Sequence, residues 1–279
     1  MWKRLANIDS RIIYCLLVLA IVLPFFLGLT LPVEVQPMTQ NAYDVIESLD
    51  NGIKVLISFD YSFSAVAECN PFVVAFLKHL ATKDAKIYAV AKSLDGAMIA
   101  RDILPQTGKN LGKVAGVDYV NLGYFAGEEA GIATLVKDIR KMYSSDFDGK
   151  PLDELEIMDG VNSIEEFELV IAVSSGGLDA WIHQVSIPYG TKLIVAVPAG
   201  MVPRTMPFVQ AKQITAMTGA LRGGAEYEKL IDSTGGATLA LNALASIQML
   251  VLALLFVGNL ASWASRRYES ETGGASVGN

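Results

Sequence analysis

The sequence predicts an α/β protein, in which a three-layer domain with a mainly parallel, five-stranded sheet of flavodoxin-like or Rossmann-like style is inserted between two transmembrane helices. Two patterns support this prediction. Short apolar runs alternate with segments of helical spacing through the middle of the chain, which is typical of a parallel sheet covered by helices on both faces. Near each end of the chain stands an uncharged segment long enough to cross a membrane as a helix.

The two uncharged segments accompany an apolar composition, with 52% hydrophobic residues and a mean hydropathy of +0.39. Residues 12–31 form the first segment, and Pro24 should kink its helix slightly. A cleaved signal peptide is the alternative, but its apolar run is only about 7–15 residues long, so we expect a retained helix over 12–32. Residues 239–264 form the second segment, and we expect a helix over 237–264.

Basic residues flank both predicted helices on their outer sides, at Lys3, Arg4, Arg11, Arg266 and Arg267. Short basic segments next to a membrane helix tend to stay in the cytoplasm. We therefore expect a two-pass protein of the cell membrane with two cytoplasmic tails, 1–11 and 265–279, of which the second is disordered. The α/β domain, residues 33–236, would then be extracytoplasmic.

The predicted domain is acidic. All but five of the 22 Lys and Arg residues and all but three of the 29 acidic residues fall within it, and the whole chain has a net charge of −7. This balance argues against nucleic acid as a partner, because neutralising phosphates needs a basic face. Cys15 and Cys69 are too differently placed to pair, so no disulfide is predicted.

Predicted helices and strands alternate from residue 41 onward. After a helix over 41–52, we predict five strands, at 53–60, 85–92, 117–124, 167–174 and 191–200. Between them we expect helices over 70–84, 96–112 (interrupted near Pro105), 127–143 and 178–190. Further along, Gly223 and Gly224 are expected to end one helix before another begins, with the acids of 225–232 in solvent.

The carboxyl ends of the five strands should form one rim, which is where open parallel sheets bind their ligands. Polar and small residues follow several of these strands directly. They give the candidate ligand-binding set Asp60, Tyr61, Ser62, Ser93, Asp95, Ser174, Ser175, Gly176, Gly177 and Gly200. Neither a Walker A motif nor a GxGxxG motif accompanies them, and no catalytic residue is predicted.

The stretch SSGG at 174–177 allows three interpretations. A nucleophile elbow needs a glycine two residues before Ser175, which is absent, and neither His79 nor His183 is well placed as the base. A cradle for phosphate or carboxylate is the second interpretation, because small residues precede a helix N-terminus there. The favoured interpretation is structural: Ser174 and Ser175 cap the helix, and the glycines permit a tight turn.

Acidic residues crowd the segment 146–168, which could hold a cation or dock a basic partner. A solvated surface is the favoured interpretation, because runs of charge usually face water. Two histidines and two cysteines scattered along the chain supply no Cys/His metal site, so neither a metal nor a cofactor is predicted.

Polar residues in the second predicted membrane helix suggest contacts with other helices. Asn242, Ser246 and Gln248 are the candidates for intramembrane contact. The alternatives are pairing with the first helix, self-association, and association with another membrane protein.

These patterns favour a non-enzymatic, membrane-anchored α/β protein that acts as an assembly, scaffold or accessory subunit through protein contacts, as a homo-oligomer. The alternative is a small-ligand binding or sensing domain that uses the strand-end rim. A membrane-bound hydrolase or transferase is the third hypothesis. The expected partners are the lipid bilayer, a second copy or another membrane protein, and, under the alternative, a small molecule.

Overall fold

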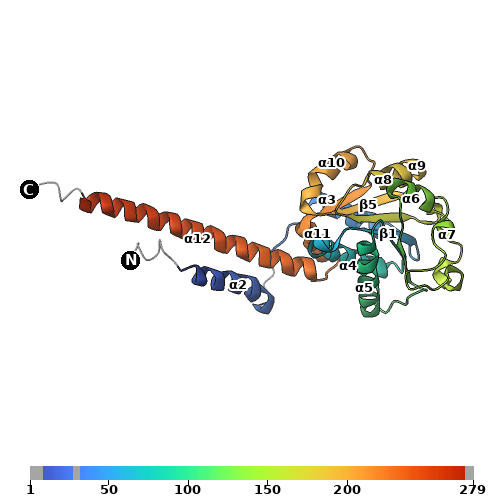
Figure 1. Cartoon of the computed structure of the whole chain (residues 1–279), viewed down its shortest axis with the longest axis horizontal. Coiled ribbons are helices and arrows are strands. Elements are labelled where there is room, and N and C mark those ends of the chain that lie inside the picture. The colour runs from blue at the N-terminus through green and yellow to red at the C-terminus, as the bar shows by residue number, and fades with distance from the viewer. Residues whose placement is uncertain (1–8, 28–31, 274–279) are drawn as a thin grey trace, which may run out of the picture. The chain divides into compact units, whose positions relative to one another are not determined.

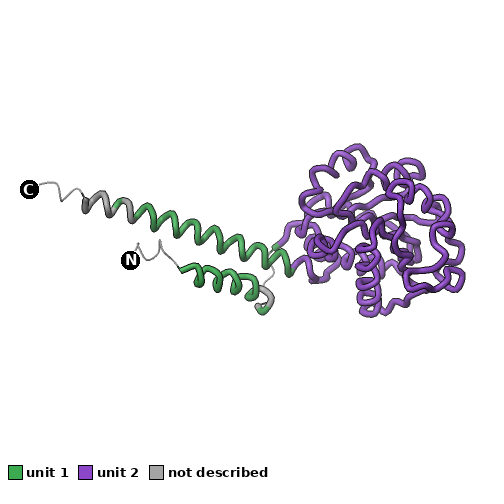
Figure 2. Tube along the Cα trace, viewed as in Figure 1, with its two compact units in different colours: residues 1–32, 239–279 green, residues 33–238 purple. Residues whose placement is uncertain are grey.

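The computed structural model of the chain describes residues 9–27 and 32–273. These residues form two compact units: Val33–Thr238, and a terminal unit from the segments 1–32 and 239–279 (Figure 2). Much of the predicted tail 1–11, residues 28–31 of the first predicted membrane helix, and residues 274–279 lie outside the described residues.

The unit Val33–Thr238 is built on a parallel sheet of six strands in the order β3-β2-β1-β4-β5-β6. The strands are β1 Lys54–Asp60, β2 Lys86–Ala91, β3 Tyr119–Tyr124, β4 Leu169–Ser174, β5 Lys192–Val197 and β6 Ala216–Gly219. The five predicted strands are confirmed, but the expected number was wrong by one. β6 escaped prediction because four residues, AMTG, are too short to show a periodic pattern.

Helices cover both faces of the sheet, so the domain has three layers (Figure 1). Successive residues of β1 point to opposite faces: Ile57 packs in one buried cluster and Leu56 in the other. One cluster includes α3 Pro37–Glu47, α4 Val66–Thr82, α5 Leu94–Asn110 and α11 Ala220–Leu230. The other includes α6 Glu128–Leu135, α7 Ile139–Met142, α8 Asp179–Trp181 and α10 Val202–Gln210.

Two predicted helices differ from the structure. α5 continues through Pro105 without interruption, whereas the helix predicted over 127–143 is split into α6 and α7. Asp138 explains the split, because its side chain accepts a hydrogen bond from the Lys141 backbone N–H at 2.9 Å and so caps a new helix.

The segment predicted as a short helix over 178–190 contains a π-helical turn. α8 leads into the π turn Ile182–Ser186 and then into α9 Ile187–Tyr189, which ends at Gly190 in a left-handed conformation. Such turns place one extra residue in a helix and often occur near functional sites. Trp181, the last residue of α8, lies immediately before this turn and is fully buried.

α11 corrects the prediction for residues 222–232. Gly223 and Gly224 lie inside this single helix, where a Cβ would meet Thr218 Oγ1 at 2.5 Å and Ala237 Cβ at 2.9 Å. The glycines therefore allow close packing and do not end a helix. Glu226 and Glu228, expected in solvent, are only 1% and 3% exposed.

Both buried glutamates of α11 hold neighbouring segments of the domain. Glu226 accepts hydrogen bonds from the Gln36 backbone N–H at 3.2 Å and from Arg222 Nε at 2.8 Å. Glu228 accepts four, from the N–H groups of Gly235, Ala237 and Thr238 and from Thr238 Oγ1, at 2.6–3.0 Å. Its carboxylate thus satisfies donors in the first turn of α12 Gly236–Gly273 that would otherwise lack partners.

The terminal unit contains α2 Ser10–Leu27 and most of α12. Among the described residues, one helical segment, Gly236–Ala264, is long and apolar enough to cross a membrane. Only 11% of its most apolar 18-residue stretch is buried within the protein. The described apolar helix Ser10–Leu23 is shorter than a span, so one of the two expected membrane helices is found among the described residues. α12 also continues to Gly273, so residues 265–273 are helical and not disordered.

We predict that Glu228→Gln destabilises the domain by about 2 kcal/mol, or roughly 4–8 °C in Tm, because an amide nitrogen replaces an oxygen that accepts backbone N–H groups. Thermal unfolding of the detergent-solubilised protein measures the effect. Glu154→Gln is the control, since Glu154 is exposed. Equal melting of the two variants would contradict this role.

Candidate functional site

An open cleft of about 440 Å³ lies at the carboxyl ends of the strands. The strand order reverses between β1 and β4, and in open α/β sheets this switch point is the usual place for a ligand. The cleft is lined by Asp60, Tyr61, Ser62, Lys92, Ser93, Glu128, Glu129, Ser175, Gly176, Gly177, Asp179 and Ala180.

The structure brings seven of the ten predicted rim residues into this cleft: Asp60, Tyr61, Ser62, Ser93, Ser175, Gly176 and Gly177. Ser174 is fully buried at the end of β4, Asp95 lies in the first turn of α5, and Gly200 lies in the short 3-10 turn Ala199–Met201. None of these three lines the cleft.

Sequence reasoning missed five lining residues: Lys92, Glu128, Glu129, Asp179 and Ala180. Lys92 directly follows β2, so the strand-end rule that selected Ser93 applies equally to it. The two glutamates begin α6, the helix after β3, and Asp179 begins α8. Extending the rule to the first turn of the following helix would have found all three acids.

Asp60 forms the floor of the cleft, with its side chain 1% exposed. Its Oδ1 accepts hydrogen bonds from Ser58 Oγ at 2.7 Å and from the Lys92 backbone N–H at 3.1 Å. Its Oδ2 accepts one from Trp181 Nε1 at 2.6 Å and lies 3.4 Å from Lys92 Nζ. A buried carboxylate is stable when its oxygens are satisfied in this way. The role of Asp60 is thus to join β1, β2 and α8.

The SSGG stretch is a turn held by one hydrogen bond to β1 and one within the turn. The Ser175 N–H donates to the Asp60 carbonyl at 3.2 Å, and the Gly176 N–H donates to Ser174 Oγ at 3.1 Å. These two donors are therefore already used, which weakens the phosphate-cradle interpretation. The predicted serine caps are wrong, because the N-cap of α8 is Leu178, which makes no side-chain cap. Ser174 supports the turn instead.

Glu128 stands at the lip of the cleft in a strained backbone conformation. Its φ is 47°, and it follows Gly127 at φ 101°. Left-handed φ is uncommon for residues other than glycine, and such residues concentrate at functional sites. Glu129 is tied to the π turn Ile182–Ser186, because its Oε1 accepts a hydrogen bond from Gln184 Nε2 at 3.0 Å.

The lining chemistry is that of a polar binding site. No histidine or cysteine occurs among the described residues that line the cleft. Cys69 is buried in α4, and burial raises the pKa of its thiol to about 12, so it stays protonated. His183 is half exposed and lies 4.0 Å from Glu129. His79 belongs to a separate cluster.

That separate cluster joins α3, α4 and α11. His79, which is 2% exposed, lies 2.7 Å from the Tyr227 hydroxyl through Nδ1 and 2.9 Å from Glu47 Oε2 through Nε2, and it stacks on Tyr43. Burial lowers the pKa of His79, although the hydrogen bond and charge of Glu47 oppose this shift. The hydrogen bonds from His79 and Lys83 lower the pKa of Glu47.

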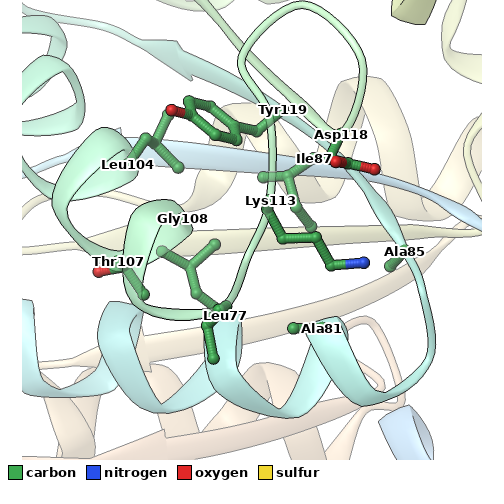
Figure 3. Close-up of a pocket in the computed structure, with 11 residues that line it drawn as sticks. Leu77, Ala81, Ala85, Ile87, Leu104, Thr107, Gly108, Lys113, Asp118 and Tyr119 are labelled. Atoms are coloured by element: carbon green, nitrogen blue, oxygen red, sulfur yellow. The ribbon is translucent and has the colours of Figure 1, made fainter.

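A second cavity, of about 20 Å³, lies between α4, α5 and the amino ends of β2 and β3 (Figure 3). Leu77, Ala81, Ile87 and Leu104 give it an apolar wall, and Lys113 and Asp118 lie at its edge. About 10–15 Å³ is needed to hold a single water molecule, so this cavity is too small for a metabolite. We interpret it as a packing defect.

The acidic segment 146–168 is folded against the sheet. Its apolar residues, including Leu152, Ile157 and Ile164, are buried, while neighbouring acids are exposed. Arg140 pairs with Asp153 and donates to two backbone carbonyls of the segment. Among the described residues, no group of three or more His, Cys, Asp or Glu side chains could hold a metal ion.

The predicted intramembrane residues differ in their burial. Asn242 is buried, and Ser246 donates its hydroxyl to the Asn242 carbonyl at 2.9 Å within the same helix. Gln248 is exposed.

No protein-family model, curated protein or solved structure matches this chain. The geometry and charge of the cleft are therefore the main evidence on function.

We predict that Asp60→Asn lowers the free energy of unfolding by about 3 kcal/mol, because the amide nitrogen of the asparagine must face a hydrogen-bond donor in a buried site. Thermal unfolding of the detergent-solubilised protein measures the loss, and Asp95→Asn, outside the cleft, is the control. An unchanged or raised Tm would indicate instead that Asp60 is kept for chemistry at the expense of stability.

We predict that His79 makes stability depend on pH. The pKa of His79 is lower in the folded protein than its ordinary value of 6.5. The stability that neutral His79 gives the fold is therefore fully present above pH 6.5 and is lost as the pH falls below that value. His79→Gln should flatten the fall in Tm between about pH 7 and pH 5. His183→Gln changes the only other histidine and should keep the wild-type slope. Identical slopes for wild type and His79→Gln would refute the prediction.

Proposed function

We propose that this chain is a membrane-anchored, non-enzymatic binding protein whose α/β domain takes a small polar ligand in the switch-point cleft. One observation carries the proposal: an open cleft of about 440 Å³ lies where the strand order reverses, lined by carboxylates, hydroxyls and glycine backbone. Ligands of open α/β sheets bind at this place. The floor is held by internal hydrogen bonds, which leaves the lip as the surface that meets the ligand.

The charge of the cleft favours a cationic ligand. Glu128, Glu129 and Asp179 line it, whereas Lys92 is the one Lys or Arg among the described lining residues. The Lys92 ammonium is already engaged, because it lies 3.4 Å from Asp60 Oδ2 and donates to the Gly177 carbonyl at 3.1 Å. A small amine or guanidinium compound therefore complements the lip, while a phosphorylated compound is repelled.

We further propose a two-pass topology with both termini in the cytoplasm and the domain outside it. The flanking bases support it, since they favour the cytoplasmic side. Arg267 lies 5.5 Å from the ring centre of Trp263, a pairing suited to the membrane interface. The proposed first span rests on the uncharged sequence of residues 12–31.

An assembly or accessory role is the second candidate. It is favoured by a specific observation, the exposed polar side chain of Gln248 in an apolar helix. The two roles are compatible, because the cleft lies within Val33–Thr238 and Gln248 lies in the terminal unit.

We predict that Gly176→Leu abolishes ligand-induced stabilisation. A Cβ at Gly176 meets no atom closer than Ser174 Oγ at 4.0 Å, so the new side chain fits the fold and fills the cleft. Thermal shifts with arginine and spermidine as probes, and ATP as the anionic comparison, measure binding; a ligand at 100 times its Kd adds about 2.7 kcal/mol.

Gly200→Leu is the matched control, because a Cβ there is also unobstructed but lies outside the cleft. Glu128→Asn tests charge, since asparagine tolerates left-handed φ and removes the carboxylate. It should weaken the response to the cationic probes without lowering the Tm of the free protein. No shift with either cationic probe, or an equal shift in Gly176→Leu, would rule out a cation site in the cleft.

A further inference from the structure

One face of α12 carries two exposed amides. Gln248 lies near the middle of the candidate span Gly236–Ala264, and Asn259 lies closer to its C-terminal end. Both side chains are exposed, and neither makes a side-chain hydrogen bond within the described part of the chain. In hydrocarbon, an amide without a partner is costly, because no water is present to satisfy it.

The two amides share their face with exposed leucines. Gln248, Leu252, Leu255 and Asn259 are spaced four, three and four residues apart, which places all four within an arc of about 60° around the helix. Leu252 is 66% exposed and Leu255 is 58% exposed. This spacing is the heptad pattern of a helix that packs along a partner helix in a left-handed crossing.

This face differs from the one that carries Asn242 and Ser246. Gln248 is turned by about 120° from Asn242 around the helix. Asn242 is buried, and the Ser246 hydroxyl donates to its carbonyl. The polar groups on the Asn242 face thus interact within the chain, whereas those on the Gln248 face remain available.

We propose that the Gln248–Asn259 face binds the same face of a second copy of this chain, in a parallel pair of α12 helices. An amide carries both donors and an acceptor, so it complements an identical amide across a two-fold axis. α2 is a poorer partner, because Ser10–Leu27 holds no Asn or Gln and leaves this face uncovered in the structure. This inference rests on the proposed insertion of α12 in the membrane.

Disulfide trapping in native membranes tests the face. In full-length protein carrying Cys15→Ser, Leu252→Cys and Leu255→Cys should each give a crosslinked homodimer on mild oxidation. Val257→Cys is the matched control, since Val257 is also exposed but lies about 180° from Gln248. The control should give little dimer.

Replacing the amides tests the contribution of the hydrogen bonds. Gln248→Leu with Asn259→Leu should weaken dimerisation in lipid bilayers by about threefold to tenfold, measured by energy transfer between labelled chains, because interhelical hydrogen bonds make modest contributions. Val257→Leu should leave the dissociation constant unchanged. A tighter dimer in the double leucine variant would overturn the role of the amides.

The remaining outcomes separate this inference from the proposal on which it rests. Extraction of the wild-type chain by alkaline carbonate would show that α12 is not inserted and would overturn both. A chain that resists extraction but is monomeric, crosslinks equally at 252 and 257, or crosslinks to a different protein would overturn the second-copy proposal alone.

Discussion

The carboxyl ends of the central strands depend on one buried side chain, the carboxylate of Asp60. Its partners come from separate parts of the chain: Ser58 in β1, Lys92 after β2, and Trp181 in α8. A buried carboxylate is stable only where donors converge on it, so these elements must meet at one point. The backbone carbonyl of Asp60 also receives the Ser175 N–H, which ties the end of β4 to the same place. The hydrogen bonds that the Asp60 carboxylate requires therefore fix the floor of the cleft.

The same constraint recurs where other segments meet the core. Glu228 gathers the backbone N–H groups that begin α12, Glu226 binds the backbone at Gln36, and His79 joins α4 to both α3 and α11. Glu226 and His79 have partners in segments distant in the sequence, besides the local contact of Glu226 with Arg222, whereas the partners of Glu228 are local. Apolar contacts alone tolerate sliding, whereas hydrogen bonds to a buried group fix position. Polar groups therefore determine how the helices are placed on the sheet.

Much of the fold could be predicted because parallel strands are buried on both faces. Val55–Phe59 is fully buried and reads as a continuous β-rich run, and the other central strands do the same. β6 lacks this signal because AMTG is short. Gly223 and Gly224 misled the prediction because glycine more often ends a helix than packs inside one, and only the positions of Thr218 and Ala237 show why it is needed here.

The candidate site could be predicted in part for a related reason. Residues directly after strands share one rim in any parallel sheet, and this rule alone placed Asp60 beside Ser175. The strand order cannot be derived from such local patterns. It decides which strand ends are neighbours at the switch point, and it leaves Gly200, which follows β5, outside the cleft. Glu128 and Glu129 were missed because a three-residue turn separates them from the end of β3.

The floor and the lip of the cleft differ in what they contribute. At the floor, the hydrogen-bonding capacity of Asp60 is used within the protein, so a ligand gains little there and would cost stability by displacing Lys92 or Trp181. At the lip, the exposed Glu128 has a strained backbone conformation that the fold tolerates. A ligand can shift a conformational equilibrium only through contacts that differ between its states. The Gly127–Glu128 turn at the start of α6 is such a place, so any response of the domain to its ligand should begin at this turn and leave the sheet unchanged.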